Sequence, residues 1–230
     1  MEDIRAAAIL LAAGAGRRVG ADQPKAFLTI GGRPILSVAA GAAAASPAVS
    51  QLVVTAPTGW EEQAEGSVEG LGLPVTIVTG GATRQASVRA ALAGLSADVE
   101  AVAVHDAARP FAPPELFTEV IGAVAAGAVG AIPIVPIPDT VKRVRDGSVV
   151  QTESRAELAL AQTPQAFRTS ELREAHEQAA RAGLDLTDDA AVMEWAGFEV
   201  RVVAGDPMNV KITTFLDLVR ADERMGGSDV

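Results

Sequence analysis

Cysteine and tyrosine are both absent from this 230-residue sequence, and its only aromatic residues are six Phe and two Trp. Without cysteine, the chain has no disulfide scaffold, no thiolate-bound zinc or iron–sulfur cluster and no cysteine nucleophile. So few aromatic rings also argue against a base-stacking platform for nucleic acid. The absence of cysteine fits a protein of the reducing cytosol, and we expect a cytoplasmic protein.

Positive charge is scarce as well. The 19 Lys and Arg residues are outnumbered by 29 Asp and Glu residues, so the formal net charge is −10. This balance argues against general affinity for nucleic acid or anionic membranes, because both attract basic surfaces. The acidic start Met1–Arg5 does not predict a secretory signal.

No run of the sequence predicts a membrane span. The stretch Val120–Ile137 is uncharged, but it is rich in Ala and Gly and is broken by Pro133 and Pro136. We expect a helix that ends near Gly127 and then a buried strand, and therefore a soluble protein.

What the sequence has in abundance is short, apolar, β-prone runs that alternate with helical patterns. We expect strands at Ala6–Leu11, Leu52–Thr55, Val75–Val78, Ala101–Val104, Gly130–Val135 and Glu199–Val203. We expect helices at Pro34–Ala45, Gly59–Glu69, Arg84–Leu95, Pro114–Ala126, Ser170–Ala182 and Asp188–Ala196, and a final helix that begins at the capping-box pattern Thr214–Asp217. This alternation predicts an α/β fold: a mostly parallel sheet with helices on both faces, in one domain that spans residues 1–230.

One segment interrupts the alternation. Asp146-Gly147 lies between two β-prone runs within Thr140–Thr152, and Asp-Gly is a strong signal for a two-residue hairpin turn. We therefore predict an inserted β-hairpin at about 138–156. An isolated hairpin is marginally stable in water, so either it packs on a second subunit or it is an ordinary surface excursion.

A glycine-containing loop, Ala12–Gly16, follows the first strand, and the basic residues Arg17, Arg18 and Lys25 come soon after it. Glycines let the backbone approach a bulky ligand, and together with cations they suit a polyphosphate. The loop has no Walker Gly-Lys-Ser/Thr, and Val19 occupies the position of the third glycine of a dinucleotide fingerprint. The alternative is a tight strand-to-helix turn with solvated arginines.

Lysine is rare in this chain: Lys25, Lys142 and Lys211 are the only three, against 16 Arg. Lys25 and Lys211 lie in loops next to predicted strands. Because lysine is a compact point charge with three donors, the pair suggests two phosphate contacts. With so few lysines, chance placement is the alternative.

The strand Ala101–Val104 leads into His105-Asp106, and Arg109 follows. Ligands bind at the carboxyl ends of strands in open α/β sheets, so Asp106 is placed to hold a divalent cation beside phosphates. Arg109 would face a second anionic group. The alternative for Asp106 is a helix cap or an Asx turn. Neither His105 nor His176 has metal-ligand spacing; we expect His105 to be an ordinary core residue and His176 to lie on a solvated helix face.

Seven segments together resemble one family, the 2-C-methyl-D-erythritol 4-phosphate cytidylyltransferases of the non-mevalonate isoprenoid pathway, over essentially the whole length. The segments are Ala12–Arg18 with Pro24-Lys25, Gly80-Gly81 with Arg84 and Ser87, Val104–Pro110, Asp139–Lys142, Thr163–Gln165, Thr187-Asp188 and Asn209–Thr213. The resemblance implies a Rossmann-like, GT-A-like nucleotidyltransferase fold in which the inserted hairpin is a dimerisation arm. It further implies a homodimer that joins CTP and methylerythritol 4-phosphate, with Mg²⁺, and releases pyrophosphate.

The resemblance also implies roles for individual residues. The catalytic residues would be Arg18, Lys25 and Lys211, and Asp106 would be the metal ligand. CTP would be bound by Ala12, Ala13, Gly14, Ala15, Gly16, Lys25, Gly80, Gly81, Arg84, Ser87 and Asp106. The second substrate would be bound by Ala107, Arg109, Thr140, Arg155, Thr163, Thr187 and Lys211, with Arg155 contributed by the partner subunit.

Two positions depart from the family pattern, and other functions remain open. Relatives often have an acid where this chain has Ala82, and another where it has Met208, although Asp206 could take the second role. The alternatives are a cytidylyltransferase for ribitol 5-phosphate or another alditol phosphate, and a non-catalytic dimeric nucleotide-binding module. A dinucleotide-dependent oxidoreductase is disfavoured, because the fingerprint's third glycine and its ribose-binding acid are both missing.

Overall fold

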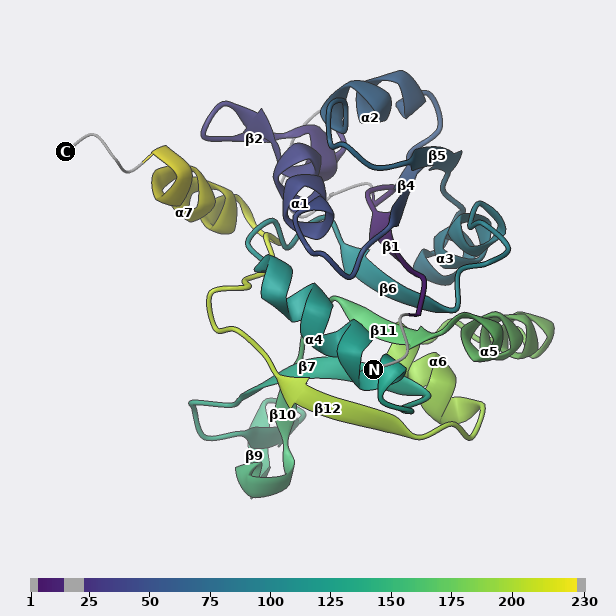
Figure 1. Ribbon diagram of the computed structural model, residues 1–230. Helices are drawn as coiled ribbons and strands as arrows, with labels where there is room; N and C mark the ends of the chain where they lie inside the picture. Colours follow the sequence, from purple (N-terminus) through teal and green to yellow (C-terminus); the bar gives the residue numbers. More distant parts are fainter. Residues whose placement is uncertain (1–3, 15–22, 227–230) are drawn as a thin grey trace.

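The computed structural model describes residues 4–14 and 23–226, and it has a central sheet with helices on both faces (Figure 1). Strand β1 (Ala6–Leu11) lies between β4 (Gln51–Ala56) and β6 (Ala101–Asp106), and β5 (Val75–Thr79) lies beyond β4. All three pairings are parallel. β1, β4 and β6 are almost entirely buried, as expected for strands covered on both faces.

The other half of the sheet is mixed. β11 (Gln165–Arg168) runs antiparallel between β6 and β7 (Gly130–Pro136), and β10 (Ala159–Ala161) also pairs antiparallel with β7. β12 (Val200–Ala204) pairs with β7 in parallel. The mostly parallel sheet predicted from the sequence is confirmed. β10 and β11 were not predicted, because each is too short to show a period and Pro164 separates them.

Two helical layers cover the sheet. Helices α1 (Ile35–Ala44), α2 (Glu61–Ser67) and α4 (Pro114–Ala125) pack on one face, and α3 (Arg84–Ala93), α5 (Thr169–Arg181) and α6 (Asp189–Trp195) pack on the other. Alternate residues of β1 divide between the layers: Ala8 and Leu10 join the first cluster, and Ala7 and Ile9 join the second. The predicted three-layer arrangement is confirmed. No helix in the described part of the chain combines the length and the apolar character needed to cross a membrane.

The prediction that His176 lies on a solvated helix face is wrong. Its side chain is buried on α5, on the same face as Leu172, Ala175 and Ala179. The spacing of these four residues is that of the apolar stripe of a helix, and this periodicity outweighs the polar character of the residue type. Within the core, His176 Nε2 lies 2.9 Å from Asp189 Oδ1, so the buried imidazole has a partner.

Helix α7 (Phe215–Gly226) begins at the predicted capping box. The Asp217 N–H donates to Thr214 Oγ1 at 3.2 Å, and Asp217 Oδ2 accepts from the Thr214 N–H at 2.8 Å. The helix packs beside the small ribbon of β2 (Thr29–Ile30) and β3 (Arg33–Pro34). At Gly31, whose φ is +55°, an added Cβ would lie 2.6 Å from Met225 Cβ, so this close approach requires glycine. The packing anchors the helix that follows the last strand-to-helix loop.

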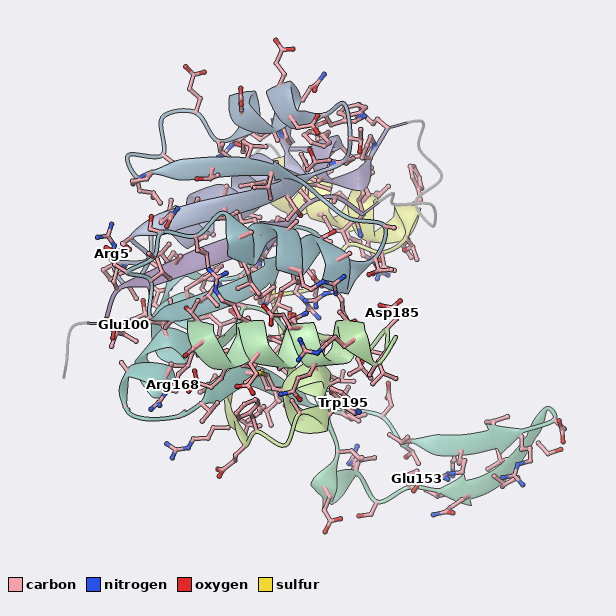
Figure 2. All side chains as sticks on the ribbon, turned by 90° about the vertical axis from the view of Figure 1, so that its right-hand side faces the viewer. Arg5, Glu100, Glu153, Arg168, Asp185 and Trp195 are labelled. Atoms are coloured by element: carbon pink, nitrogen blue, oxygen red, sulfur yellow. The ribbon has the colours of Figure 1, made fainter. Side chains whose placement is uncertain are left out.

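The predicted hairpin is present. β8 (Lys142–Arg145) and β9 (Ser148–Thr152) pair antiparallel, and Asp146 and Gly147 at the turn both have positive φ, 49° and 77°. Every residue of both strands is exposed, and Figure 2 shows the hairpin projecting away from the body. Val144 and Val149 are 59% and 62% exposed. A short 3-10 turn, η2 (Arg155–Glu157), follows it.

Candidate active site

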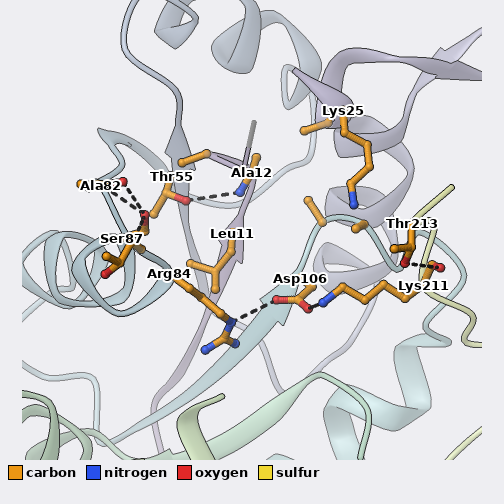
Figure 3. Close-up of a pocket in the computed structure, with 17 residues that line it drawn as sticks. Leu11, Ala12, Lys25, Thr55, Ala82, Arg84, Ser87, Asp106, Lys211 and Thr213 are labelled. Carbon is orange, nitrogen blue, oxygen red and sulfur yellow. Dashed lines mark hydrogen bonds and ion pairs between the residues drawn. The ribbon is translucent and has the colours of Figure 1, made fainter. Parts of the chain in front are cut away.

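A pocket of about 470 Å³ lies at the carboxyl ends of β1, β5 and β6 (Figure 3). After β1 the chain continues to β4, towards one edge of the sheet, whereas after β6 it continues to β7, towards the other edge. A crevice between neighbouring strands whose connections diverge is where open α/β sheets bind ligands. The volume lies in the usual range for small-molecule sites. The predicted site residues that line this pocket are Ala12, Ala13, Gly14, Lys25, Gly81, Arg84, Ser87, Asp106, Ala107 and Lys211.

Asp106, the last residue of β6, is held between two cations. Lys211 Nζ lies 2.5 Å from Asp106 Oδ2, and Arg84 Nε lies 3.4 Å from Asp106 Oδ1. Figure 3 shows the two side chains reaching the carboxylate from opposite sides. Burial alone would raise the pKa of Asp106, but Arg84 and Lys211 outweigh it and hold that pKa well below its usual range. The carboxylate is therefore ionised and bound by side chains, not used as a helix cap.

Lys25 and Lys211 approach the pocket from distant parts of the sequence. Lys25 begins the 3-10 turn η1 (Lys25–Phe27), and its Nζ donates a 2.7 Å hydrogen bond to the carbonyl oxygen of Ile212, 187 positions away. Ile212 is fully buried and directly follows Lys211. The described lining residues include one carboxylate, that of Asp106, and three cationic side chains, those of Lys25, Arg84 and Lys211. The pocket therefore carries net positive charge, which suits a polyanionic ligand.

The glycines between β5 and α3 are required by packing. A Cβ on Gly80 would lie 2.2 Å from Ala13 Cβ, and a Cβ on Gly81 would lie 2.4 Å from Ala86 Cβ. Gly80 therefore lies against the loop after β1 and does not line the pocket, whereas Gly81 does. Ser87 Oγ accepts a 3.1 Å hydrogen bond from the Gly81 N–H, so the first turn of α3 fixes the loop that faces the pocket.

His105, Arg109 and Thr163 form a buried connection next to Asp106. His105 Nδ1 lies 3.0 Å from Thr163 Oγ1, and His105 Nε2 lies 3.0 Å from the carbonyl oxygen of Arg109. Thr163 Oγ1 also accepts a 3.1 Å hydrogen bond from the Asp106 N–H. Burial is the largest cause that lowers the pKa of His105, to about 4. His105 is thus the core residue that the sequence predicted. Its two ring nitrogens connect the end of β6 to Thr163 and to the backbone of Arg109.

The residues predicted to bind the second substrate are only partly gathered. Arg109 lies near the pocket, and its guanidinium donates a 2.7 Å hydrogen bond from NH1 to the carbonyl oxygen of Asn209. Thr140, Arg155 and Thr187 are exposed and do not line the pocket within one chain. Arg155 instead donates to the carbonyl oxygens of Ile137 and Pro138 at the base of the hairpin. Their roles remain predictions.

Three predicted residues, Ala15, Gly16 and Arg18, lie in 15–22, outside the residues that the structure describes. Residues that line the pocket and were not singled out from the sequence include Thr55, Thr83 and Thr213. A single threonine inside a strand, or shortly before a helix, carries no pattern that would have identified it. Asp189, which pairs with Arg84 at 2.8 Å, was also missed. Its one signal was the acidic pair at the predicted start of α6.

The side chains around the pocket limit the kind of metal site that it can form. No group of three or more His, Asp or Glu side chains that could hold a metal ion occurs within 4–14 and 23–226. Neither Asp206 nor Met208 lines the pocket, and Asp206 Oδ1 accepts a 2.7 Å hydrogen bond from the Met208 N–H. The role of Asp206 as the second acid therefore stays a prediction. One ionised carboxylate, Asp106, fits a magnesium ion whose other ligands are substrate phosphate oxygens and water.

Comparison with known proteins identifies relatives along the whole described chain. Residues 6–226 match the family model for 2-C-methyl-D-erythritol 4-phosphate cytidylyltransferase, IspD. The bifunctional enzyme IspD/IspF of Rhodopseudomonas palustris (strain HaA2) is 46% identical over 228 residues, which are 96% of this chain and 55% of that protein. This chain therefore spans about half the length of the curated relatives it matches.

Solved structures agree with the family match. 4-Diphosphocytidyl-2C-methyl-D-erythritol synthase from Anaerococcus prevotii DSM 20548 superposes with a TM-score of 0.87 at 28% identity, and the match covers 97% of each chain. 2-C-Methyl-D-erythritol 4-phosphate cytidylyltransferase from Thermus thermophilus gives a TM-score of 0.79 at 36% identity, over 95% of this chain and 98% of that one. Both matches include the mixed, mostly parallel sheet and its two helical layers.

Proposed function

Because this chain belongs to the 2-C-methyl-D-erythritol 4-phosphate cytidylyltransferase (IspD) family, we propose that it transfers CMP from CTP to 2-C-methyl-D-erythritol 4-phosphate. The products are 4-diphosphocytidyl-2-C-methyl-D-erythritol and pyrophosphate. The observation that carries the proposal is the cationic pocket at the strand ends, which Lys25 lines and where Arg84 and Lys211 pair with Asp106. Such a pocket suits a triphosphate, and the family resemblance assigns Lys25, Arg84 and Asp106 to CTP.

The reaction needs charge stabilisation more than it needs a nucleophilic side chain. A phosphate oxygen of the alcohol phosphate attacks the α-phosphorus of CTP, and the bond from that phosphorus to the pyrophosphate oxygen breaks. Both reactants are anions, so the barrier contains the cost of bringing negative charge together. Catalysis of such transfers rests on positioning and on preorganised positive groups. Lys25 and Lys211, anchored through Ile212 and Asp106, are preorganised cations of this kind.

A divalent metal fits the same site. Asp106 would hold Mg²⁺ together with phosphate oxygens of the nucleotide, and the ion would neutralise charge on the triphosphate. The low pKa of Asp106 keeps the carboxylate ready as a ligand across the neutral range. The resemblance implies that the loop 12–16 and Arg18 also contribute to the triphosphate site.

A homodimer completes the proposal. The hairpin leaves Val144, Val149 and Val150 more than half exposed, which is unusual for apolar side chains that stay in water. A second copy that packs against this arm would cover them. It would also bring Arg155, at the foot of the arm, to the second-substrate site of the other copy, which has its own Thr140 and Thr187.

Pyrophosphate release from the purified chain tests the proposed function. The assay contains CTP and Mg²⁺, with methylerythritol 4-phosphate and ribitol 5-phosphate in parallel reactions. Release with the first alcohol phosphate alone is expected. Release with ribitol 5-phosphate alone would move the protein to the alditol branch, and CTP binding without release from either substrate would favour the non-catalytic binding module.

A further inference from the structure

Two titratable side chains lie fully buried behind the pocket, and the proposed reaction does not use them directly. Asp189 is the first residue of α6, and His176 lies in the middle of α5; both side chains are 0% exposed. A buried carboxylate is costly unless it is paired, so its partners indicate its purpose.

Asp189 connects His176 to the wall of the pocket. His176 Nε2 lies 2.9 Å from Asp189 Oδ1, and Arg84 NH2 lies 2.8 Å from Asp189 Oδ2. The guanidinium of Arg84 then reaches Asp106 Oδ1 through its Nε at 3.4 Å. Four charged or polar groups from α5, α6, α3 and β6 therefore form one continuous row that ends on the carboxylate facing the pocket.

Arg84 needs a neighbouring carboxylate because of its position in α3. It is the first residue of α3, where the unpaired N–H groups of the helix create partial positive charge that disfavours a cation. Burial alone would lower the pKa of Arg84, but Asp189 and then Asp106 outweigh it and raise that pKa above its ordinary value. Of the two carboxylates, Asp189 is the one that no substrate or metal would engage.

His176 sets the orientation of the Asp189 carboxylate. Its Nε2 engages Oδ1, which leaves Oδ2 facing Arg84, and its Nδ1 has no hydrogen-bond partner among the described residues. This arrangement is met by a ring that carries its proton on Nε2 and donates it to Asp189. Buried ion pairs can often be replaced by apolar residues without loss of stability. The row is therefore better explained by the side-chain positions that it fixes than by a contribution to the stability of the fold.

We propose that Asp189, oriented by His176, is a positioning residue that holds the Arg84 guanidinium against Asp106 and thereby preorganises the nucleotide side of the pocket. The inference rests on the proposed function, because it assigns Arg84 and Asp106 to the CTP site. It adds that two buried residues from α5 and α6, which pack beside α3 in the same helical layer, control their alignment.

A double-mutant cycle tests the coupling between Asp189 and Arg84. Asp189→Asn keeps an oxygen for His176 but leaves Arg84 facing an amide without charge, so kcat/KM for CTP should fall roughly 10–100-fold, as for other residues that support a binding group. The variant Arg84→Gln should fall by at least as much, and the double variant should be no worse than Arg84→Gln alone. Losses that multiply in the double variant, or an unimpaired Asp189→Asn, would overturn the proposal.

A pair of variants at His176 gives an independent readout. His176→Gln retains a donor near the position of Nε2 and should keep kcat/KM for CTP within about threefold, whereas His176→Leu removes the donor and should lose about tenfold or more. Leu172→Ala, on the same buried face of α5, is the control for lost stability alone and should not change KM for CTP. Equal effects of the two His176 variants would contradict the orienting role. This pair also carries the test if Asp189→Asn does not fold.

Binding of CTP, measured by calorimetry on the same variants, separates this inference from the proposed function. If the wild-type chain binds CTP but releases no pyrophosphate, the proposed function is rejected. The positioning role would still be supported if the effects of Asp189→Asn and Arg84→Gln on CTP affinity are not additive. If the wild-type chain turns over and the losses are additive, the function stands and the positioning role of Asp189 is rejected.

Discussion

Asp106 ends strand β6 with its carboxylate between Lys211 and Arg84, and this pairing keeps two cations at fixed places in the pocket. Without the carboxylate, the two like charges would repel each other and turn towards water. With it, they are already in place when an anionic ligand arrives. Preorganised charge of this kind costs no rearrangement in the transition state.

Lys25 gives the sharpest prediction at the scale of single residues. Lys25→Ala should lower kcat by on the order of 10²–10³, because one preorganised cation is lost from the site of charge development. The variant should still fold, since the charged hydrogen bond from Nζ to Ile212 contributes only about 1.5–3 kcal/mol. Steady-state pyrophosphate release and a thermal melt measure the two effects.

Arg5→Ala is the matched control for Lys25→Ala. Arg5 is an exposed cation paired with Asp98 at the amino end of β1, at the opposite end of the strand from the pocket (Figure 2). The Arg5→Ala variant should leave kcat unchanged. A Lys25→Ala enzyme with a near-normal rate would remove Lys25 from the catalytic machinery.

At the scale of elements, the β8–β9 hairpin forms a sheet of its own and contributes no buried residue to the core. Removal of residues 140–152 should therefore cost the folded monomer little stability, because every residue of its two strands is exposed. It should nevertheless give monomers with little activity if a second copy packs on the arm. Light scattering and pyrophosphate release measure these two outcomes.

A point variant sharpens the hairpin prediction. Val149→Lys places a charge at a side chain that is 62% exposed in one chain and should weaken dimerisation without lowering the melting temperature of the monomer. Ser148→Lys, one position earlier on the opposite face of β9, is the control and should leave the oligomeric state unchanged. A fully active monomer after the deletion would mean that the arm is an ordinary surface excursion.

At the scale of the whole molecule, the buried histidine next to the site makes folding sensitive to acid. The pKa of His105 is about 4 in the folded chain and 6.5 at its ordinary value, so the unfolded chain binds more protons between these pH values. The contribution of His105 to the free energy of unfolding is therefore full above about pH 6.5 and is lost as the pH falls towards 4, by about 3 kcal/mol at most. The depressed pKa values of Asp106 and Asp189 act in the same direction at lower pH.

Urea unfolding of the wild-type chain at pH 7 and pH 5 measures this acid sensitivity. His105→Gln removes the titrating group but keeps a donor and an acceptor for Thr163 and Arg109. The free energy of unfolding of this variant should therefore fall less between the two pH values. The same fall in both proteins would assign the acid sensitivity to other groups.

Much of the fold could be predicted from the sequence because each element carries its own local signal. The apolar run of β1, the capping box at Thr214 and the Asp146-Gly147 turn all specify their structures through neighbouring residues. The order of the glycine loop, Asp106 and Lys211 also pointed to a phosphate-binding site. These features, and the family they resemble, depend on residue types and spacing alone.

Only the tertiary structure decided which of these residues meet. Lys25 contacts the chain beside Lys211 at 2.7 Å, and the short antiparallel strands β10 and β11 pair with β7, which comes earlier in the chain. His176 is buried beside Asp189, which lies on the next helix. Residue type suggested that a polar histidine on α5 faces water, but the charge of Asp189 behind the pocket supplied a partner that made its burial favourable. Partners of this kind are set by how neighbouring helices pack on each other and on the sheet, which no local pattern encodes.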